Sequence, residues 1–137
     1  VDILEDGLAE ADFVTIHLPL TNETRGMMKA PQFKAMKKTA YICNLGRGPM
    51  MDESDLYQAL VDGEIAGAAL DVFDPEPPTS DNPLFQLDNV IATPHTGGDT
   101  KESRERLAIM AAKSILAALD GEPMYPNWAN RQAMEKK

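Results

Sequence analysis

This 137-residue chain has only one cysteine, no long apolar run and no excess of positive charge. Its single cysteine, Cys43, cannot form an internal disulfide, and no apolar run approaches the roughly 18 residues of a transmembrane helix. Lys and Arg number 13 against 22 Asp and Glu, and the resulting net charge of -9 repels nucleic-acid phosphates and anionic membranes. We therefore expect a cytoplasmic protein that binds neither nucleic acid nor membrane.

Three further features are absent: an initiating methionine, a signal-peptide pattern, and the G-x-G-x-x-G turn of dinucleotide-binding domains. The chain begins at Val1, and its first residues are typical of the end of an element that is already under way. Hydrophobic residues make up 43% and charged residues 26%, which is ordinary globular composition. We expect a fragment that forms one domain.

Apolar runs alternate with helical patterns along the chain. Short runs bounded by proline or glycine predict strands at 12–19, 40–45, 67–73 and 89–93, and we expect the first of them to be a buried strand. Apolar residues at helical spacing predict helices at 31–40, at 52–62 with Asp52 as the N-cap and Gly63 after the end, and at 101–120 before Gly121. Residues 74–83 contain four prolines and are expected to be a loop, and residues 122–137 show no pattern.

This alternation indicates an α/β fold: a doubly wound, Rossmann-like parallel sheet, of which only the later half is present. Such a sheet is expected to be covered by helices on both faces. We assign residues 1–121 to this partial domain and residues 122–137 to a C-terminal tail. In such sheets ligands bind at the carboxyl ends of the strands, so polar residues there are candidates for function.

Two charged residues stand at predicted strand ends. Arg47 lies between Gly46 and Gly48, where its planar guanidinium could bind a carboxylate through two hydrogen bonds or form a structural salt bridge. Asp71 ends an apolar run, and a carboxylate buried there requires partners, which a helix N-terminus or a ligand amide could supply.

A histidine and a glutamate complete the set. His95 follows Pro94 at the end of the last predicted strand, where an imidazole could act as a general acid or base. Glu76 in the proline-rich loop would be a solvated carboxylate unless a histidine lies nearby. Arginine, glutamate and histidine together supply a carboxylate clamp, a proton donor and a partner for that donor, which reduction of a 2-oxo acid requires in addition to a hydride-carrying cofactor.

The chain resembles the D-isomer-specific 2-hydroxyacid dehydrogenases from about Asp12 to about Gly121. The motifs that carry the resemblance occur in one order, at family-like spacing. They are His17-Leu18-Pro19-Leu20-Thr21 with Glu23-Thr24-Arg25-Gly26; Asn44-Leu45-Gly46-Arg47-Gly48 with Asp52-Glu53; Gly67-Ala68-Ala69-Leu70-Asp71-Val72-Phe73 through Glu76-Pro77; and Thr93-Pro94-His95-Thr96-Gly97-Gly98.

The resemblance implies roles for these residues. It implies that Arg47 binds the substrate's carboxylate and carbonyl, that His95 donates the proton, and that Glu76 pairs with His95. It also implies a cofactor site for NAD or NADP, with no metal, in which Asp71 and the backbone near Leu45 hold the nicotinamide carboxamide. The residues expected to bind the cofactor are His17, Leu18, Pro19, Thr24, Asn44, Leu45, Gly46, Arg47, Asp71, His95, Gly97 and Gly98.

The resemblance implies an oxidoreductase that transfers a hydride between NAD(P)H and a small 2-oxo or 2-hydroxy acid, expected as a homodimer. One alternative is a non-catalytic module that binds nicotinamide cofactors, because the same resemblance extends to transcriptional corepressors. Another is an isolated folding unit in which an exposed sheet edge pairs two chains. The sequence selects neither the 2-oxo acid nor NAD over NADP.

Overall fold

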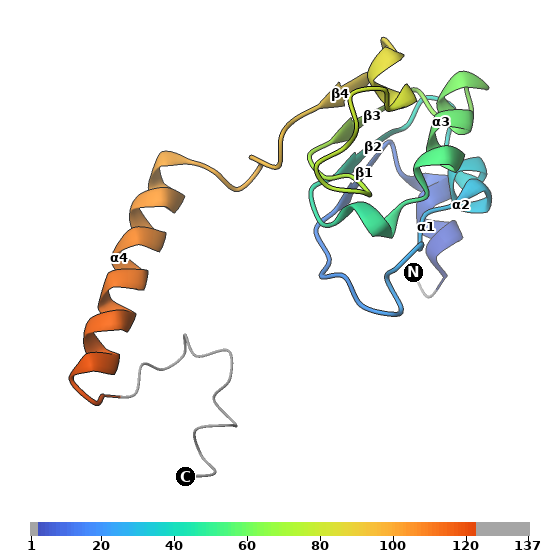
Figure 1. Cartoon of the computed structure of the whole chain (residues 1–137). Helices are drawn as coiled ribbons and strands as arrows, with labels where there is room; N and C mark the ends of the chain where they lie inside the picture. Colours follow the sequence, from blue (N-terminus) through green and yellow to red (C-terminus); the bar gives the residue numbers. More distant parts are fainter. Residues whose placement is uncertain (1–2, 123–137) are drawn as a thin grey trace. The chain divides into compact units, whose positions relative to one another are not determined.

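The computed structural model describes residues 3–122, and the chain divides into two units, residues 1–97 and 98–137. The first unit alternates helices and strands (Figure 1). Its helices are α1 (Leu4–Glu10), α2 (Ala30–Ala35) and α3 (Glu53–Val61), its strands are β1 (Phe13–Ile16), β2 (Tyr41–Asn44), β3 (Gly67–Leu70) and β4 (Val90–Ala92), and short 3₁₀ helices lie at Gly48–Met50 and Pro83–Gln86. The described part of the second unit contains α4 (Lys101–Leu119).

The four strands form one parallel sheet in the order β1-β2-β3-β4, which confirms the predicted α/β class. Ile16 pairs with Asn44, Asn44 with Leu70, and Leu70 with Ala92, so the carboxyl ends of all four strands are in register. The residue that follows each of these strands, such as Asp71 after Leu70, therefore lies at the carboxyl-terminal end of the sheet, which we call its carboxyl edge.

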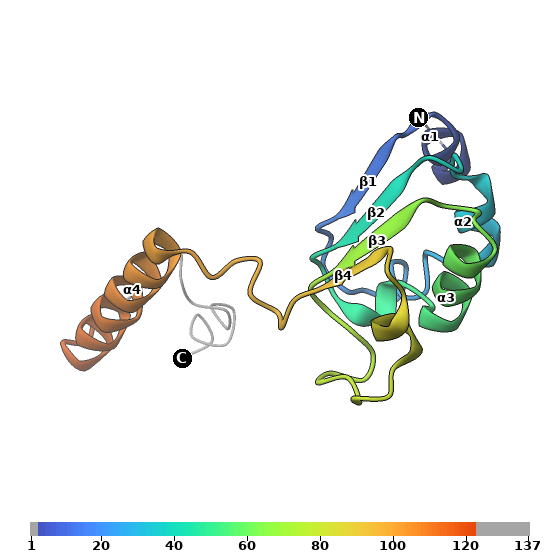
Figure 2. The same ribbon diagram turned by 90° about the horizontal axis from the view of Figure 1, so that it is seen from above.

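The helices α1, α2 and α3 all lie on one face of this sheet (Figure 2). Phe33 of α2, Leu56 of α3 and Ile42 of β2 have no exposed surface and belong to the core between the layers. On the opposite face Phe13 is 75% exposed and stacks on Tyr41 at a ring-centroid distance of 5.8 Å, and Ile91 is 68% exposed. Within this unit the expectation of helices on both faces is not met, and β1 is not the buried strand that was expected.

Helix ends follow local chemistry at α3 and tertiary contacts at α2. Asp52 caps α3 as predicted, and Gly63 after its end has a φ of +66°, a value that glycine tolerates best. The helix predicted over 31–40 ends instead at Ala35, so the lysines at 37 and 38 lie beyond it. Met36 is extended, and the chain then turns into β2, where backbone pairing begins with a hydrogen bond from the Tyr41 N–H to the Asp12 carbonyl at 3.0 Å.

The second unit confirms the long helix predicted from residue 101. Thr100 caps α4 by accepting a hydrogen bond from the Ser103 backbone N–H at 3.1 Å, and Gly121 after the helix has a φ of +75°. Within residues 3–122 no helix combines the length and the apolar character needed to cross a bilayer. The predicted tail lies almost wholly outside the described residues.

Candidate active site

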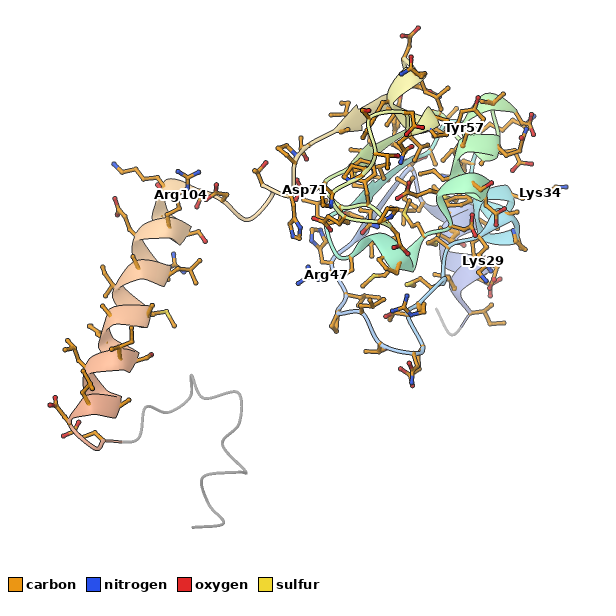
Figure 3. The ribbon with its side chains drawn as sticks, viewed as in Figure 1. Lys29, Lys34, Arg47, Tyr57, Asp71 and Arg104 are labelled. Atoms are coloured by element: carbon orange, nitrogen blue, oxygen red, sulfur yellow. The ribbon has the colours of Figure 1, made fainter. Side chains whose placement is uncertain are left out.

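The segments that follow β1 and β2 enclose a hollow of about 490 Å³ at the carboxyl edge of the sheet. Two exposed leucines, Leu18 and Leu45, give it apolar walls. The full lining is His17, Leu18, Pro19, Leu20, Leu45, Gly46 and Arg47. Six of the residues predicted to bind a cofactor therefore surround one hollow, and Arg47 and Asp71 lie at the same end of the unit (Figure 3).

Asn44 shapes the loop that carries Arg47. Its side chain is 1% exposed, accepts a hydrogen bond from the Gly46 N–H at 3.0 Å and donates one to the Arg47 carbonyl at 3.1 Å. Both of these Asn44 side-chain hydrogen bonds are therefore made within the loop itself. The Arg47 side chain donates one hydrogen bond to the Gly46 carbonyl at 2.7 Å, and because a guanidinium has five N–H donors, the others remain for a ligand.

Gly48 allows the Arg47 loop to touch the start of the loop that carries Glu76. A Cβ added at Gly48 would lie 1.9 Å from the Phe73 carbonyl oxygen and 2.8 Å from the Asp74 nitrogen. No side chain fits at that distance, so only glycine permits this approach. The resemblance motif included Gly48 without giving a reason for it.

Asp71 is buried, at 5% exposure, and its partners come from the segment after β4. Its Oδ1 accepts hydrogen bonds from the Thr93 hydroxyl at 2.6 Å and the Thr96 N–H at 2.8 Å, and its Oδ2 accepts one from the Gly97 N–H at 2.8 Å. Burial by itself raises the pKa of Asp71, but these hydrogen bonds and the nearby charge of His95 outweigh it and hold the pKa below its ordinary value. The Asp71 carboxylate therefore holds the chain in place both before and after His95.

His95 has a left-handed backbone, with a φ of +56°, a conformation that costs a non-glycine residue on the order of 1 kcal/mol. Such a conformation persists where the surroundings fix it, and the three hydrogen bonds to Asp71 do so here. The ring Nδ1 of His95 lies 2.5 Å from Oε1 of Glu76, with side chains 45% and 36% exposed. The predicted pairing of Glu76 with a histidine is therefore present in the structure.

The other predicted residues have more local contacts. Thr24 donates a hydrogen bond to the carbonyl of Pro19, a residue that lines the hollow, at 2.8 Å and accepts one from the Thr21 N–H at 2.8 Å. His17 Nε2 lies 2.8 Å from the Thr15 hydroxyl. Gly98 begins the second unit, so the structure does not bring it into this site.

Sequence reasoning missed Thr93 and Glu53. Thr93 is the hydroxyl partner of Asp71, and its only signal was its place in the motif before Pro94 and His95. Glu53 binds the loop that carries Glu76, accepting hydrogen bonds from the Asp74 N–H and the Asn82 side chain. Its place beside Asp52 suggested only a helix start.

The arrangement combines a cation, an imidazole and carboxylates at one sheet edge. Arg47 can bind an anionic group, while the imidazole of His95, oriented by Glu76 through Nδ1, leaves Nε2 for proton exchange with a ligand. Among residues 3–122 no cluster of three or more His, Cys, Asp or Glu side chains could hold a metal ion. The chemistry that these side chains support is proton transfer beside a bound anion.

Comparison with known proteins identifies the family. Residues 1–97 match the model of the D-isomer specific 2-hydroxyacid dehydrogenase NAD binding domain. A glyoxylate reductase from Aeropyrum pernix is 46% identical over 132 residues, which are 96% of this chain and 39% of that protein. The chain therefore spans about two fifths of the length of this relative.

Solved structures agree with this match. The NAD-complexed D-isomer specific 2-hydroxyacid dehydrogenase from Lactobacillus delbrueckii ssp. bulgaricus is 34% identical, with a TM-score of 0.79 over 88% of this chain and 41% of that one. The enzyme from Xanthobacter autotrophicus Py2 in complex with NADPH and MES is 37% identical, with a TM-score of 0.76 over 94% of this chain and 52% of that one. The chain belongs to the D-isomer specific 2-hydroxyacid dehydrogenase family and contains part of its NAD-binding domain.

Proposed function

We propose that the protein containing this chain transfers a hydride between NAD(P)H and a small 2-oxo or 2-hydroxy acid. The observation that carries the proposal is the contact of 2.5 Å between His95 Nδ1 and Glu76 Oε1. Arg47, Glu76 and His95 follow the carboxyl ends of the neighbouring strands β2, β3 and β4. The family match and the relative named glyoxylate reductase support it. Arg47, Glu76 and His95 are the proposed catalytic residues.

Arg47 binds the substrate's carboxylate in this proposal. Its guanidinium is exposed beside the hollow, and Asn44 fixes the loop beneath it. A planar guanidinium can donate two parallel hydrogen bonds to a carboxylate, which orients the adjacent carbonyl group. The substrate's 2-oxo carbon is thereby held in one position for reduction.

His95 supplies the proton in reduction and removes it in oxidation. The contact with Glu76 engages Nδ1, so Nε2 is the atom that exchanges a proton with the substrate oxygen. In reduction the carbonyl carbon gains the hydride while its oxygen gains the proton from Nε2, and the carbonyl becomes a hydroxyl. The Glu76 carboxylate orients the ring and offsets the positive charge of its protonated form.

The residues around the hollow fit the nicotinamide end of NAD or NADP. Leu18 and Leu45 present apolar surface to a flat ring, and His17, Arg47 and the Gly46 backbone provide polar groups beside it. Asp71 accepts three hydrogen bonds from groups of its own chain. Since a carboxylate can accept about four, one acceptor position remains for the N–H of a carboxamide. When bound, the cofactor supplies the hydride.

The remaining proposals concern the whole protein. We propose a cytoplasmic homodimer whose partner is a small acid rather than nucleic acid or membrane, with the partial cofactor domain extending to residue 121. The net charge of -9 argues against nucleic acid and membrane as partners. The exposed Phe13, Tyr41 and Ile91 form apolar surface of the kind that protein interfaces cover, which supports the dimer. Sedimentation of the intact protein tests the dimer.

The deciding experiment is turnover of NADH and NADPH by the intact protein with a panel of 2-oxo acids, including glyoxylate. We expect oxidation of one cofactor with at least one acid, and loss of that activity in His95→Asn. Cofactor binding without turnover on any acid would favour the non-catalytic binding module instead.

A further inference from the structure

Glu53 is the first residue of α3, yet its carboxylate is not used to cap that helix. Asp52 performs the capping, because its Oδ1 accepts hydrogen bonds from the Ser54 and Asp55 N–H groups, each at 3.0 Å. The Glu53 carboxylate binds outside the helix instead. Its Oε1 accepts a hydrogen bond from the Asp74 N–H at 2.7 Å, and its Oε2 accepts one from the Asn82 side-chain amide at 2.7 Å.

These two contacts hold the two ends of the loop that carries Glu76. Asp74 directly follows the buried Phe73, and Asn82 caps the 3₁₀ helix at Pro83–Gln86 by accepting a hydrogen bond from the Leu84 N–H at 3.0 Å. The prolines at 75, 77 and 78 have no N–H to donate. A side chain from outside the loop is therefore well suited to fix its path.

The position of Glu76 depends on this path. An ion pair as exposed as that of Glu76 and His95 contributes little by its own attraction, so it cannot by itself order two loops. Asp71 fixes the His95 side of the pair through Thr93, Thr96 and Gly97. Glu53 is the corresponding carboxylate on the other side, because the Asp74 N–H that it binds lies two residues before Glu76 in the chain.

We infer that Glu53 is a positioning residue that holds Glu76 in place for His95. The inference assigns a function to a side chain that lies outside the hollow and contacts neither Glu76 nor His95 in the described hydrogen bonds. Its catalytic consequence rests on the proposed function, whereas its structural part stands on the contacts alone.

The structural part is tested by nitrogen-15 NMR of His95 in the 137-residue chain, which contains only two histidines. Glu53→Gln should shift the His95 Nδ1 resonance in the same direction as Glu76→Gln, and the double variant should shift it no further than Glu76→Gln alone. The reason is that a glutamine has one acceptor oxygen for two donors, so one end of the loop is released. Asp55→Asn is the matched control, because Asp55 lies in the same helical turn but binds the Ala30 N–H at 2.9 Å. A Glu53→Gln spectrum like that of Asp55→Asn overturns the inference.

A rescue pair keeps the test decisive if Glu53→Gln is unstable. Asn82→Asp alone places two carboxylates against each other and should release the loop. In Glu53→Gln with Asn82→Asp, the new amide at position 53 can donate to the new carboxylate at position 82, while its oxygen still accepts from the Asp74 N–H. The His95 resonance should then return toward its original position. The carboxylate introduced at position 82 can also keep the cap on Leu84. A double variant no closer to the original than either single variant contradicts the inference.

Turnover in the intact protein tests the catalytic consequence. Glu53→Gln should lower kcat on the order of 10-fold, since misplacing a catalytic group by a fraction of an ångström has effects of this size. KM for the acid should change far less, because Arg47 is untouched, and the rescue pair should restore kcat. Normal kcat together with a shifted His95 resonance would refute the catalytic part alone. If the intact protein reduces no 2-oxo acid, the proposed function fails while the NMR result still decides the role of Glu53.

Discussion

At the scale of single residues, Arg47 is set apart by its shape as well as its charge. Arg47→Lys in the intact protein should lower kcat/KM for a 2-oxo acid roughly 10- to 100-fold, because an ammonium group cannot reproduce two parallel hydrogen bonds to a carboxylate. Steady-state kinetics measure this loss. Arg106→Lys on the exposed surface of α4 is the matched control and should behave like the original protein. Equal kinetics for both variants on every acid would remove Arg47 from the site.

Asp71 makes the stability of the chain depend on pH in a defined direction. Burial raises the pKa of Asp71, but hydrogen bonds from Thr93, Gly97 and Thr96, together with the charge on His95, outweigh burial and hold that pKa below its ordinary value. The ionised form is thus favoured in the folded state, and its stabilising contribution is complete above the unfolded-state pKa of about 3.9. That contribution is lost as the pH falls through the lower folded-state pKa.

The variant that tests this is Asp71→Asn, whose amide would direct a donor at the Gly97 N–H. Urea unfolding of both chains should give a difference in unfolding free energy that is constant near neutral pH and narrows in acid, below about pH 4. Amide hydrogen exchange at Thr96 and Gly97 should be faster in the variant. A difference that does not change with pH would mean that the Asp71 charge plays no part in holding the loop.

At the scale of elements, α3 supports the site through its N-terminus. Asp52→Ala removes hydrogen bonds to the Ser54 and Asp55 N–H groups and should lower the free energy of unfolding by about 1 kcal/mol, the usual cost of losing an N-cap. Asp62→Ala at the other end of the same helix is the control, and it should be neutral or slightly stabilising because a carboxylate there faces the negative end of the helix dipole. Thermal or urea unfolding measures both, and equal losses would contradict the capping role.

The elements also separate what the sequence could predict from what it could not. Strands β1 to β4 lie inside the predicted runs because strands of a parallel sheet are short and apolar, and the cap at Asp52 follows from local chemistry. The early end of α2 could not be predicted, since it accompanies the backbone pairing of β2 with β1, a strand from a distant part of the sequence. The prediction that β1 is buried was wrong, because apolar character does not reveal which face of a sheet is covered by another layer.

The candidate site also combines features that the sequence could predict with features that it could not. Pairing of Glu76 with His95 was predicted by the family resemblance, and the need of Asp71 for partners by its place in an apolar run. The identity of those partners could not be predicted, because the fold brings Thr93 and Gly97 to Asp71 from the segment after the neighbouring strand. The contact of Gly48 with Phe73 depends likewise on the meeting of two loops.

At the scale of the whole molecule, the chain contains the proposed chemical groups but no glycine-rich phosphate-binding turn. No G-x-G-x-x-G occurs in its 137 residues, and much of a dinucleotide's affinity comes from the pyrophosphate at such a turn and from an acidic residue on the ribose. The hollow of about 490 Å³ beside Arg47 can contact the nicotinamide end. Immobilising the cofactor costs about 4–15 kcal/mol, which contacts at one end do not offset.

We therefore predict that the 137-residue chain binds NADH with a Kd above about 1 mM, equivalent to less than about 4 kcal/mol of binding free energy. Isothermal titration calorimetry measures this directly, with the intact protein titrated in parallel as the control that should bind far more tightly. Sedimentation at the same concentration is needed, because Phe13, Tyr41 and Ile91 expose apolar surface through which copies could associate. Micromolar binding by a monomer would mean that the main anchor for the cofactor lies within these residues. Micromolar binding by an assembled form would mean that a second copy supplies the missing contacts.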